Sequence, residues 1–396
     1  MISDTYQTVR PQYELADIFN LYWDEYKENK KIPSQIHKIV NNIRLCRTAK
    51  LGSHKISCSH KNCSHEEISY NSCRDRHCPK CQGSKQIAWV DKRLNELFPV
   101  PYFHTVFTLP HSLNTLTLFN QRFIYDLFFD ATSYALNQFA MDDKYLGGQL
   151  GFFGILHTWG QNLSYHVHIH YIVSGCGLLK QSRSVKRLPY QEKFLFPVKA
   201  MSKTVRCYFI KRLKRAYYDE KLNLPGELQR FGDIEEFERF CIALGKESWV
   251  CYAKPPFTGP EKVISYIGRY TNRVAISNRR IKSIDNHKII FSYKDYKEDC
   301  KRKDIHFTAH TFIQRLFYHY LPYGFRRIRH YGFLCGSDRK TNLEIIKSFF
   351  EKLGKIKLEM IQGIKEWRER FKGCLERICP VCKTGTLLFE FSYDGW

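Results

Sequence analysis

The sequence has no long uninterrupted apolar run. No window approaches the eighteen or so apolar residues that a membrane-spanning helix needs, so no membrane partner is expected. Residues 1–30 carry acidic and aromatic side chains without the basic start and apolar stretch of a signal peptide. These absences predict a cytoplasmic protein.

A complete phosphate-binding loop is also missing. Neither "LGKES" (244–248) nor "LGKIK" (353–357) completes the GxxxxGK[ST] pattern, which argues against a helicase. Internal repeats and low-complexity linkers are missing as well, so the sequence defines domain boundaries only softly.

Acidic residues are few relative to basic ones. The chain of 396 residues has 39 Asp and Glu against 63 Lys and Arg, a formal net charge of +24 spread along its length. Such a surface attracts polyanions, and 25 Tyr and 29 Phe can stack on bases, so nucleic acid is the leading partner. The alternatives are a basic protein that is merely soluble and, with no long amphipathic basic helix to support it, a protein of anionic membrane surfaces.

Hydrophobic periodicity and turn residues indicate a mixed fold. Helices are expected at 12–48, 112–141, 198–222, 260–271, 308–320 and 340–371, and strands or hairpins at 102–110, 151–175, 248–257 and 274–296. The expected domains are an N-terminal helical region (1–50), a zinc-binding module (51–95), a catalytic domain (100–335) with an insertion at about 178–245, and a C-terminal helix with a CxxC tail (336–396).

The fifteen cysteines indicate metal binding rather than disulfides, since several form CxxC-like pairs in a chain without an export signal. The segment "CSHKNCSHEEISYNSCRDRHCPKCQ" predicts one tetrahedral zinc site with four thiolates, Cys58, Cys63, Cys78 and Cys81. Four thiolates leave no open coordination position on the ion, so this zinc is expected to be structural and to help the module bind nucleic acid. The alternative ligands in the same segment are Cys73, His77, His60 and His65, and these extra donors leave room for a second ion.

A second and weaker metal signal lies near the C-terminus. Cys379 and Cys382 form one CxxC pair, with Cys374 and Cys335 as possible helpers. One pair cannot close a site alone.

A row of histidines carries different chemistry. In "YHVHIHYIVSG" (165–175), alternation places His166, His168 and His170 on one strand face. If "GFFGILHTWG" forms a hairpin with this strand, His157 lies opposite His168 or His170 and can supply a third ligand. Imidazoles without thiolates can hold a divalent ion and leave positions open for a substrate oxygen, whereas the alternative is an ordinary solvated strand face.

A pair of tyrosines supplies candidate nucleophiles. "FTGPEKVISYIGRYTNR" (257–273) opens with a capping-box pattern, and Tyr266 and Tyr270 lie one helical turn apart on the same face. A phenol has a pKa near 10, so it attacks phosphorus at neutral pH only with help, which a divalent ion provides. The alternative is a buried stripe that the two tyrosines share with Val263 and Ile267.

Five segments in order give the chain a family resemblance: "SCRDRHCPKCQ", "YFHTVFTLPHSLN", "LHTWGQNLSYHVHIHYIVSGCGL", "YIGRYTNRVAIS" and "LPYGFRRIRHYGFL". Over roughly residues 35–335 it resembles the transposases of the insertion sequence 91 family, which are two-tyrosine HUH enzymes (two histidines flanking a hydrophobic residue). The resemblance implies an α+β fold: an HUH-nuclease antiparallel sheet with flanking helices, plus an N-terminal helical and zinc-binding module. The sequence departs from the family in the long gap between Cys58 and Cys63, and in Cys176, where glycine is usual.

The resemblance also implies roles for the candidate residues. His168 and His170 become the HUH pair, with His166 as a neighbour or alternative, and Tyr266 and Tyr270 become the paired nucleophiles. The expected ion is Mg²⁺ or Mn²⁺. The implied activity is rolling-circle transposition: cleavage of single-stranded DNA at the transposon ends, a 5′-phosphotyrosine intermediate, a free 3′-OH used by the host replication machinery, and strand transfer, on a protein associated with the nucleoid.

Two other functions are alternatives to a transposase. A metal-dependent hydrolase of the amidohydrolase kind also uses a His-x-His strand end, but that fold needs eight strand and helix repeats. A non-catalytic zinc protein that binds nucleic acid is the other alternative. The basic segment "GFRRIRHYGF" (324–333) is a candidate DNA contact or an ordinary solvated loop.

Overall fold

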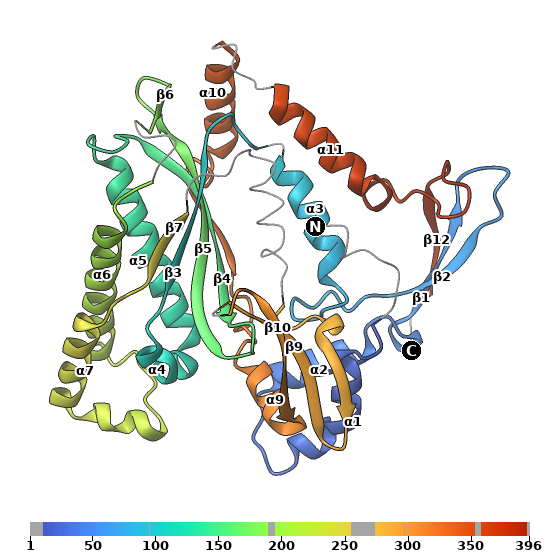
Figure 1. Ribbon diagram of the computed structural model, residues 1–396, viewed down its shortest axis with the longest axis horizontal. Coiled ribbons are helices and arrows are strands. Elements are labelled where there is room, and N and C mark those ends of the chain that lie inside the picture. Colours follow the sequence, from blue (N-terminus) through green and yellow to red (C-terminus); the bar gives the residue numbers. More distant parts are fainter. Residues whose placement is uncertain are drawn as a thin grey trace.

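The computed structural model describes residues 11–94, 96–188, 195–254, 274–296, 298–352 and 358–393. Its centre is a six-stranded antiparallel sheet in the order β11-β4-β5-β3-β7, with β6 paired to β5 (Figure 1). The strands are β3 (Tyr102–Thr108), β4 (Gln149–Trp159), β5 (Tyr165–Leu179), β6 (Ser184–Arg187), β7 (Cys251–Lys254) and β11 (Ile328–Gly332).

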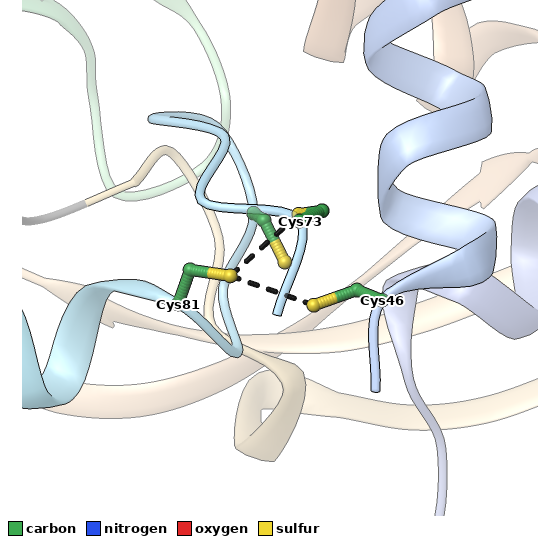
Figure 2. Close-up of side chains that lie close together, drawn as sticks. Cys46, Cys73 and Cys81 are labelled. Atoms are coloured by element: carbon green, nitrogen blue, oxygen red, sulfur yellow. Dashed lines mark hydrogen bonds between the residues drawn. The ribbon is translucent and has the colours of Figure 1, made fainter. Parts of the chain in front are cut away.

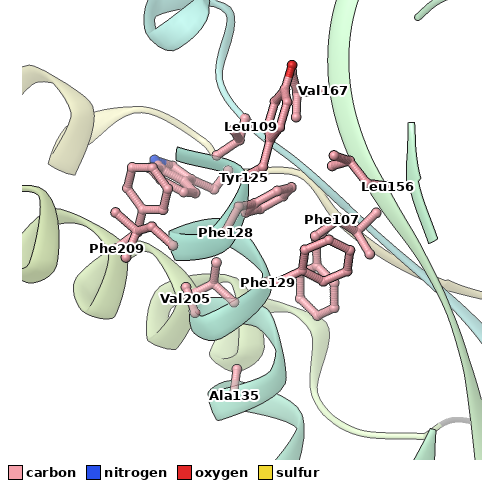
Figure 3. Close-up of a cluster of buried hydrophobic side chains, with 14 of the residues drawn as sticks. Phe107, Leu109, Tyr125, Phe128, Phe129, Ala135, Leu156, Val167, Val205 and Phe209 are labelled. Atoms are coloured by element: carbon pink, nitrogen blue, oxygen red, sulfur yellow. The ribbon is translucent and has the colours of Figure 1, made fainter. Parts of the chain in front are cut away.

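One face of this central sheet packs on a layer of helices (Figure 1). They are α4 (Asn114–Phe119), α5 (Gln121–Met141), α6 (Val198–Tyr218) and α7 (Ile234–Lys246). Figure 3 shows part of the resulting core, in which Phe128 and Phe129 of α5 lie against Phe107 of β3 and Leu156 of β4. Val167, Ile169 and Tyr171 of β5 are buried in the same core, so the alternation in β5 points its apolar residues to this side.

The other face packs on α3 (Gln82–Leu94) and α10 (Arg339–Lys352), and α11 (Leu358–Leu375) packs against α3. Ile155 of β4, Ile172 of β5 and Tyr102 of β3 contribute to this second core. The histidine row of β5 is on the same face, because residues two apart in a strand point the same way.

A third core lies beside the end of the central sheet that carries the β4–β5 turn. It is formed by α1 (Leu15–Lys27), α2 (Ser34–Leu45), α9 (Ala309–Phe317), and a sheet in the order β10-β9-β8: β8 (Ile281–Asp285), β9 (Lys288–Asp295) and β10 (Lys301–Thr308). Trp159 and Leu163, next to the turn, are buried in this core and so fix the end of the hairpin.

A three-stranded sheet joins residues from the two ends of the chain (Figure 1). Its order is β12-β1-β2, from β1 (Ser53–Cys58), β2 (Glu66–Tyr70) and β12 (Leu387–Tyr393). Short 3₁₀ helices complete the described elements: η2 (Ala49–Leu51), η3 (His111–Leu113), η4 (Gly226–Gly232) and η5 (Asn278–Arg280).

The mixed α+β fold expected from the sequence is confirmed, with an antiparallel sheet, flanking helices and a cysteine-rich N-terminal region. Every strand pairing in the described residues is antiparallel, which is incompatible there with the parallel barrel of an amidohydrolase. The sequence patterns did not predict six of the described strands, β1, β2, β6, β10, β11 and β12, or the helices α3 and α7. The domain boundaries stay a prediction. Among the described helices, none has the length and apolarity to cross a membrane.

Candidate active site and metal centres

The β4–β5 hairpin positions the histidines. Its turn closes through a hydrogen bond from the Gly160 N–H to the Ser164 carbonyl. Its register places His157 directly opposite His168, one of the two partners that the sequence predicted. Further along the hairpin, Gly154 lies opposite Tyr171, and a Cβ at this glycine would lie 2.4 Å from the Tyr171 ring. The glycine therefore lets the aromatic ring lie flat across the strand pair.

The structure brings three of the predicted ligands together. His157, His168 and His170 each offer a ring nitrogen within 4.8 Å of the others. His157 is buried, whereas His168 and His170 are partly exposed. This donor set fits a divalent ion with open positions for other ligands, because the imidazoles come from one face of the strand pair.

Hydrogen bonds orient two of these rings. His168 Nδ1 lies 2.8 Å from the carbonyl oxygen of His166, so Nδ1–H donates and the Nε2 lone pair is the one left to bind an ion. His166 itself lies outside the group of three. Its ring packs against His111 and His168, and burial together with the neighbouring His111 lowers its pKa.

His104 on β3 was not among the site residues predicted from the sequence. Its Nε2 lies 2.9 Å from His170 Nδ1, and the two rings are stacked. Burial, aided by the charge of Lys254, lowers the pKa of His104 to about 4, so its imidazole is neutral at neutral pH and can accept the His170 Nδ1–H. The alternation in "YFHTVFT" puts His104 on one face of a strand, but only strand order reveals that β3 adjoins β5.

The predicted nucleophiles Tyr266 and Tyr270 lie outside the described residues. Their assignment therefore stays a prediction.

The expected zinc site is wrong in its grouping of cysteines. Cys78 and Cys81 meet Cys73 and Cys46. Figure 2 labels Cys46, Cys73 and Cys81, with sulfur–sulfur distances of 3.4 Å from Cys46 to Cys81 and 3.6 Å from Cys73 to Cys81. Tetrahedral zinc with Zn–S bonds of about 2.3 Å separates its sulfurs by about 3.8 Å, so the four thiols fit zinc. Cys46 was missed because it follows α2, outside the segment that contains the other cysteines.

Cys58 and Cys63 belong to a different cluster. They meet Cys379 and Cys382 of the C-terminal tail, and all four sulfurs lie within 4.8 Å of one another. The linear sequence favoured one shared site for these four cysteines because Cys58 is close in sequence to Cys78, with a second ion as the alternative. In the structure β1 and β2 carry the first pair away from the second.

The alternative ligand His77 has another role. Its Nδ1 lies 3.0 Å from Asp75 Oδ1, and its Nε2 accepts a hydrogen bond from the Leu321 N–H. Burial lowers the pKa of His77 despite the neighbouring carboxylate. Because both ring nitrogens are engaged, this histidine ties the cysteine-rich segment to the chain after α9. His60 and His65 are also outside the three groups found in the described residues.

The basic segment 324–333 runs through β11 and lines a surface cavity of about 690 Å³. Arg329 forms an ion pair with Asp126 of α5, and its guanidinium lies 4.3 Å from the centre of the Phe129 ring. His330 points to the other face and lies 3.1 Å from an Arg93 nitrogen. Arg326 is exposed. The segment is therefore partly structural, and its contact with DNA stays a prediction.

Comparisons with known proteins agree with this architecture. Residues 151–342 match a family model described as "Putative transposase", and residues 18–109 match one described as "Transposase zinc-binding domain". The chain is 38% identical over 386 residues to the "Putative transposase y4qJ" of Sinorhizobium fredii, which covers 96% of each chain. It is 27% identical to the transposase for insertion sequence element IS801 of Pseudomonas savastanoi pv. phaseolicola, over 85% of this chain and 82% of that one.

No solved structure matches the chain. The Cys46 cluster lies within the residues that match the zinc-binding domain, and its four thiols suit zinc. The histidine hairpin lies within the residues that match the transposase model. Together with relatives that align over most of its length, these matches show that the chain belongs to the insertion sequence 91 family of transposases.

Proposed function

We propose that this transposase cleaves and rejoins single-stranded DNA at the ends of an insertion sequence, in a rolling-circle pathway. The observation that carries the proposal is the convergence of His157, His168 and His170 on one face of a rigid strand pair. Partly exposed imidazoles in that arrangement suit a divalent ion that also contacts a phosphate oxygen.

The chemistry is a transesterification at phosphorus. The phenolic oxygen of Tyr266 or Tyr270 attacks the scissile phosphate and loses its proton. The new O–P bond replaces the bond from phosphorus to the 3′ oxygen, which takes up a proton and leaves. The product is a 5′-phosphotyrosine and a free 3′-OH, which host replication extends. Attack by a 3′-OH on the phosphotyrosine reverses the step and rejoins DNA, so no nucleotide cofactor is consumed.

His157, His168 and His170 would hold Mg²⁺ or Mn²⁺. The ion would neutralise charge on the phosphate oxygens as the phenol attacks. The protein's own contribution is orientation: the His166 carbonyl and His104 each fix one ring, so that the nitrogens facing the ion are set by the fold. Imidazole nitrogens favour Mn²⁺ over Mg²⁺, which makes Mn²⁺ the better probe.

Basic side chains would hold the DNA. The net charge of +24 supports a strong, salt-dependent affinity for phosphates. We extend the proposal to segment 324–333, where Arg326 is exposed at the cavity and can meet a phosphate. The zinc-binding region would position this surface without taking part in the chemistry.

The test is capture of the covalent intermediate. Single-stranded DNA that carries the element's end and is labelled at its 3′ end should form a denaturant-resistant adduct with the protein in the presence of Mn²⁺ or Mg²⁺. The adduct should disappear in the Tyr266→Phe, Tyr270→Phe double variant. An adduct that persists in this variant would show that the nucleophile is another residue. If wild-type protein binds the DNA without forming an adduct, the chain acts as a non-catalytic zinc protein instead.

A further inference from the structure

Four cysteines from opposite ends of the chain meet beside the β12-β1-β2 sheet. Cys58 ends β1 and Cys63 follows it, whereas Cys379 and Cys382 precede β12. The Cys58 and Cys382 sulfurs lie 3.6 Å apart across a sequence separation of 324 residues. The Cys63 and Cys379 sulfurs lie 3.9 Å apart.

These distances fit a metal and exclude a disulfide. A disulfide needs sulfurs about 2.05 Å apart, whereas tetrahedral zinc–thiolate geometry separates them by about 3.8 Å. All four sulfurs lie within 4.8 Å of one another, so one ion can contact each of them.

Backbone donors on both sides of the cluster point to the sulfurs. The His60 N–H donates to Cys58 Sγ at 3.4 Å, and the Gly385 N–H donates to Cys382 Sγ at 3.2 Å. Each donor belongs to the turn that carries its cysteine, and such hydrogen bonds stabilise thiolates over thiols. Each of the two turns therefore supplies a backbone donor to one of its own cysteines, although one turn comes from each end of the chain.

The turns also fit closely against each other. A Cβ at Gly385 would lie 2.4 Å from Cys58 Sγ, so a glycine is needed for the two turns to approach. Ser59 N–H donates to the Thr386 carbonyl, and Thr386 N–H donates to Ser59 Oγ, each at 2.9 Å. β1 then pairs with β12 from Cys58 opposite Leu387 to Ser53 opposite Tyr393.

We propose that Cys58, Cys63, Cys379 and Cys382 bind a second zinc ion and form a zinc ribbon assembled from both ends of the chain. Half of its ligands lie beyond residues 18–109, the span of the matched zinc-binding domain. Four thiolates close the coordination sphere, so the ion is structural. The ion links the C-terminal tail to the N-terminal module. Because the site forms only when the tail is folded, the free energy of zinc binding stabilises the folded tail. This proposal does not depend on the cleavage mechanism.

The first experiment measures metal content in the full-length protein. The Cys379→Ser, Cys382→Ser double variant should hold one zinc ion fewer per chain than wild type after gel filtration. A Cys300→Ser, Cys335→Ser variant is the matched control, because both of these cysteines are exposed and lie outside the clusters. Cobalt substitution separates this site from the histidines, since thiolate-to-cobalt charge transfer comes only from cysteine ligands. The intensity of this charge-transfer band should fall to about half in the double variant, because one of the two cysteine clusters is lost.

The second experiment uses a variant in which all four cysteines are retained. Gly385→Ala adds a Cβ against Cys58 Sγ, so it should release one zinc ion to a chelator faster than wild type does. Hydrogen exchange should show lost protection in β1 and β12, with β4 and β5 unchanged. The proposal is overturned if the double variant has the metal content of its control. It is also overturned if Gly385→Ala retains zinc and protection like wild type, or if Cys58 and Cys382 are found joined as a disulfide.

Discussion

His157 and His168 lie directly opposite each other across β4 and β5, with ring centroids 5.5 Å apart. Both side chains stand on the same face of a sheet that is packed on helices on both sides, which holds the rings in fixed positions. Ligands on adjacent strands of such a sheet need little rearrangement to bind an ion.

The first prediction concerns these two ligands. His157→Ala and His168→Ala should each lower the rate of single-strand cleavage by roughly 100-fold or more, because each removes a donor to the ion. DNA affinity should keep its salt dependence, since it rests on Lys and Arg. Cleavage kinetics and a salt titration of DNA binding measure the two effects.

His166→Ala is the matched control, because His166 shares the strand face but lies outside the cluster. It should retain most of the cleavage activity. Equal losses in His166→Ala and His168→Ala would contradict the assignment, and so would unfolding of the His168 variant seen by circular dichroism.

A second prediction addresses His104 as a positioning residue. Loss of its contact with His170 Nδ1 in His104→Phe should weaken Mn²⁺ binding by roughly 10–100-fold, as loss of an outer-shell partner does. Cleavage at saturating Mn²⁺ should largely recover, so a Mn²⁺ titration of the rate separates affinity from chemistry. His104→Gln, which retains a hydrogen-bonding group, should be less impaired. A rate defect that no Mn²⁺ concentration relieves would refute this role.

The third prediction tests the zinc site of Figure 2. Cys46→Ser should lose one zinc ion per chain and lower the free energy of unfolding by at least roughly 3 kcal/mol, since zinc binding is coupled to folding. Cys207→Ser is the control, because Cys207 is exposed. Metal analysis and urea unfolding give the two readouts. If Cys46→Ser retained all of its zinc, Cys46 would be a buried core residue and not a zinc ligand.

The fourth prediction separates two arginines of segment 324–333. Arg326→Ala should weaken DNA binding and lower the salt slope by about one, as loss of a phosphate contact does. Arg329→Ala should instead cost about 1 kcal/mol of stability, because Arg329 pairs with Asp126 and lies over Phe129. Anisotropy titrations and thermal unfolding distinguish the two. An Arg326→Ala protein with wild-type DNA affinity at all salt concentrations would remove the segment from the interface.

The fifth prediction is an acid-linked loss of stability at His319. Burial lowers the pKa of His319 to about 4, against about 6.5 in the unfolded chain, with the charge of Arg315 acting in the same direction. The unfolded state therefore binds more protons between these values. The contribution of neutral His319 to the free energy of unfolding is complete above pH 6.5. Up to roughly 3 kcal/mol of it is lost as the pH falls toward 4.

A His319→Asn variant should show a flatter dependence of the unfolding free energy on pH than wild type between pH 7 and 5. Its stability at pH 7 should be lower, because His319 contacts Thr158 and the Leu163 carbonyl. Parallel pH profiles for the two proteins would show that His319 does not carry the effect.

Short sequence patterns were sufficient to predict the local features of the chain. Alternation in "YHVHIHYIVSG" predicted a strand with histidines on one face, and the short connection after Trp159 predicted its hairpin partner, because period and turn geometry act over few residues. The exact register stayed open between His168 and His170 until the strand pairing was known. The order of the segments also led to the family, which the comparisons confirm.

The contacts between distant residues became known from the folded structure alone. Cysteine spacing indicated zinc but assigned Cys58 and Cys63 to the wrong partners, since Cys379 and Cys382, which precede β12, come from the other end of the chain. In the same way, His104 reaches His170 only because β3 pairs with β5. Such pairings depend on which apolar faces pack together over the whole chain, and spacing within one segment carries no information about that packing.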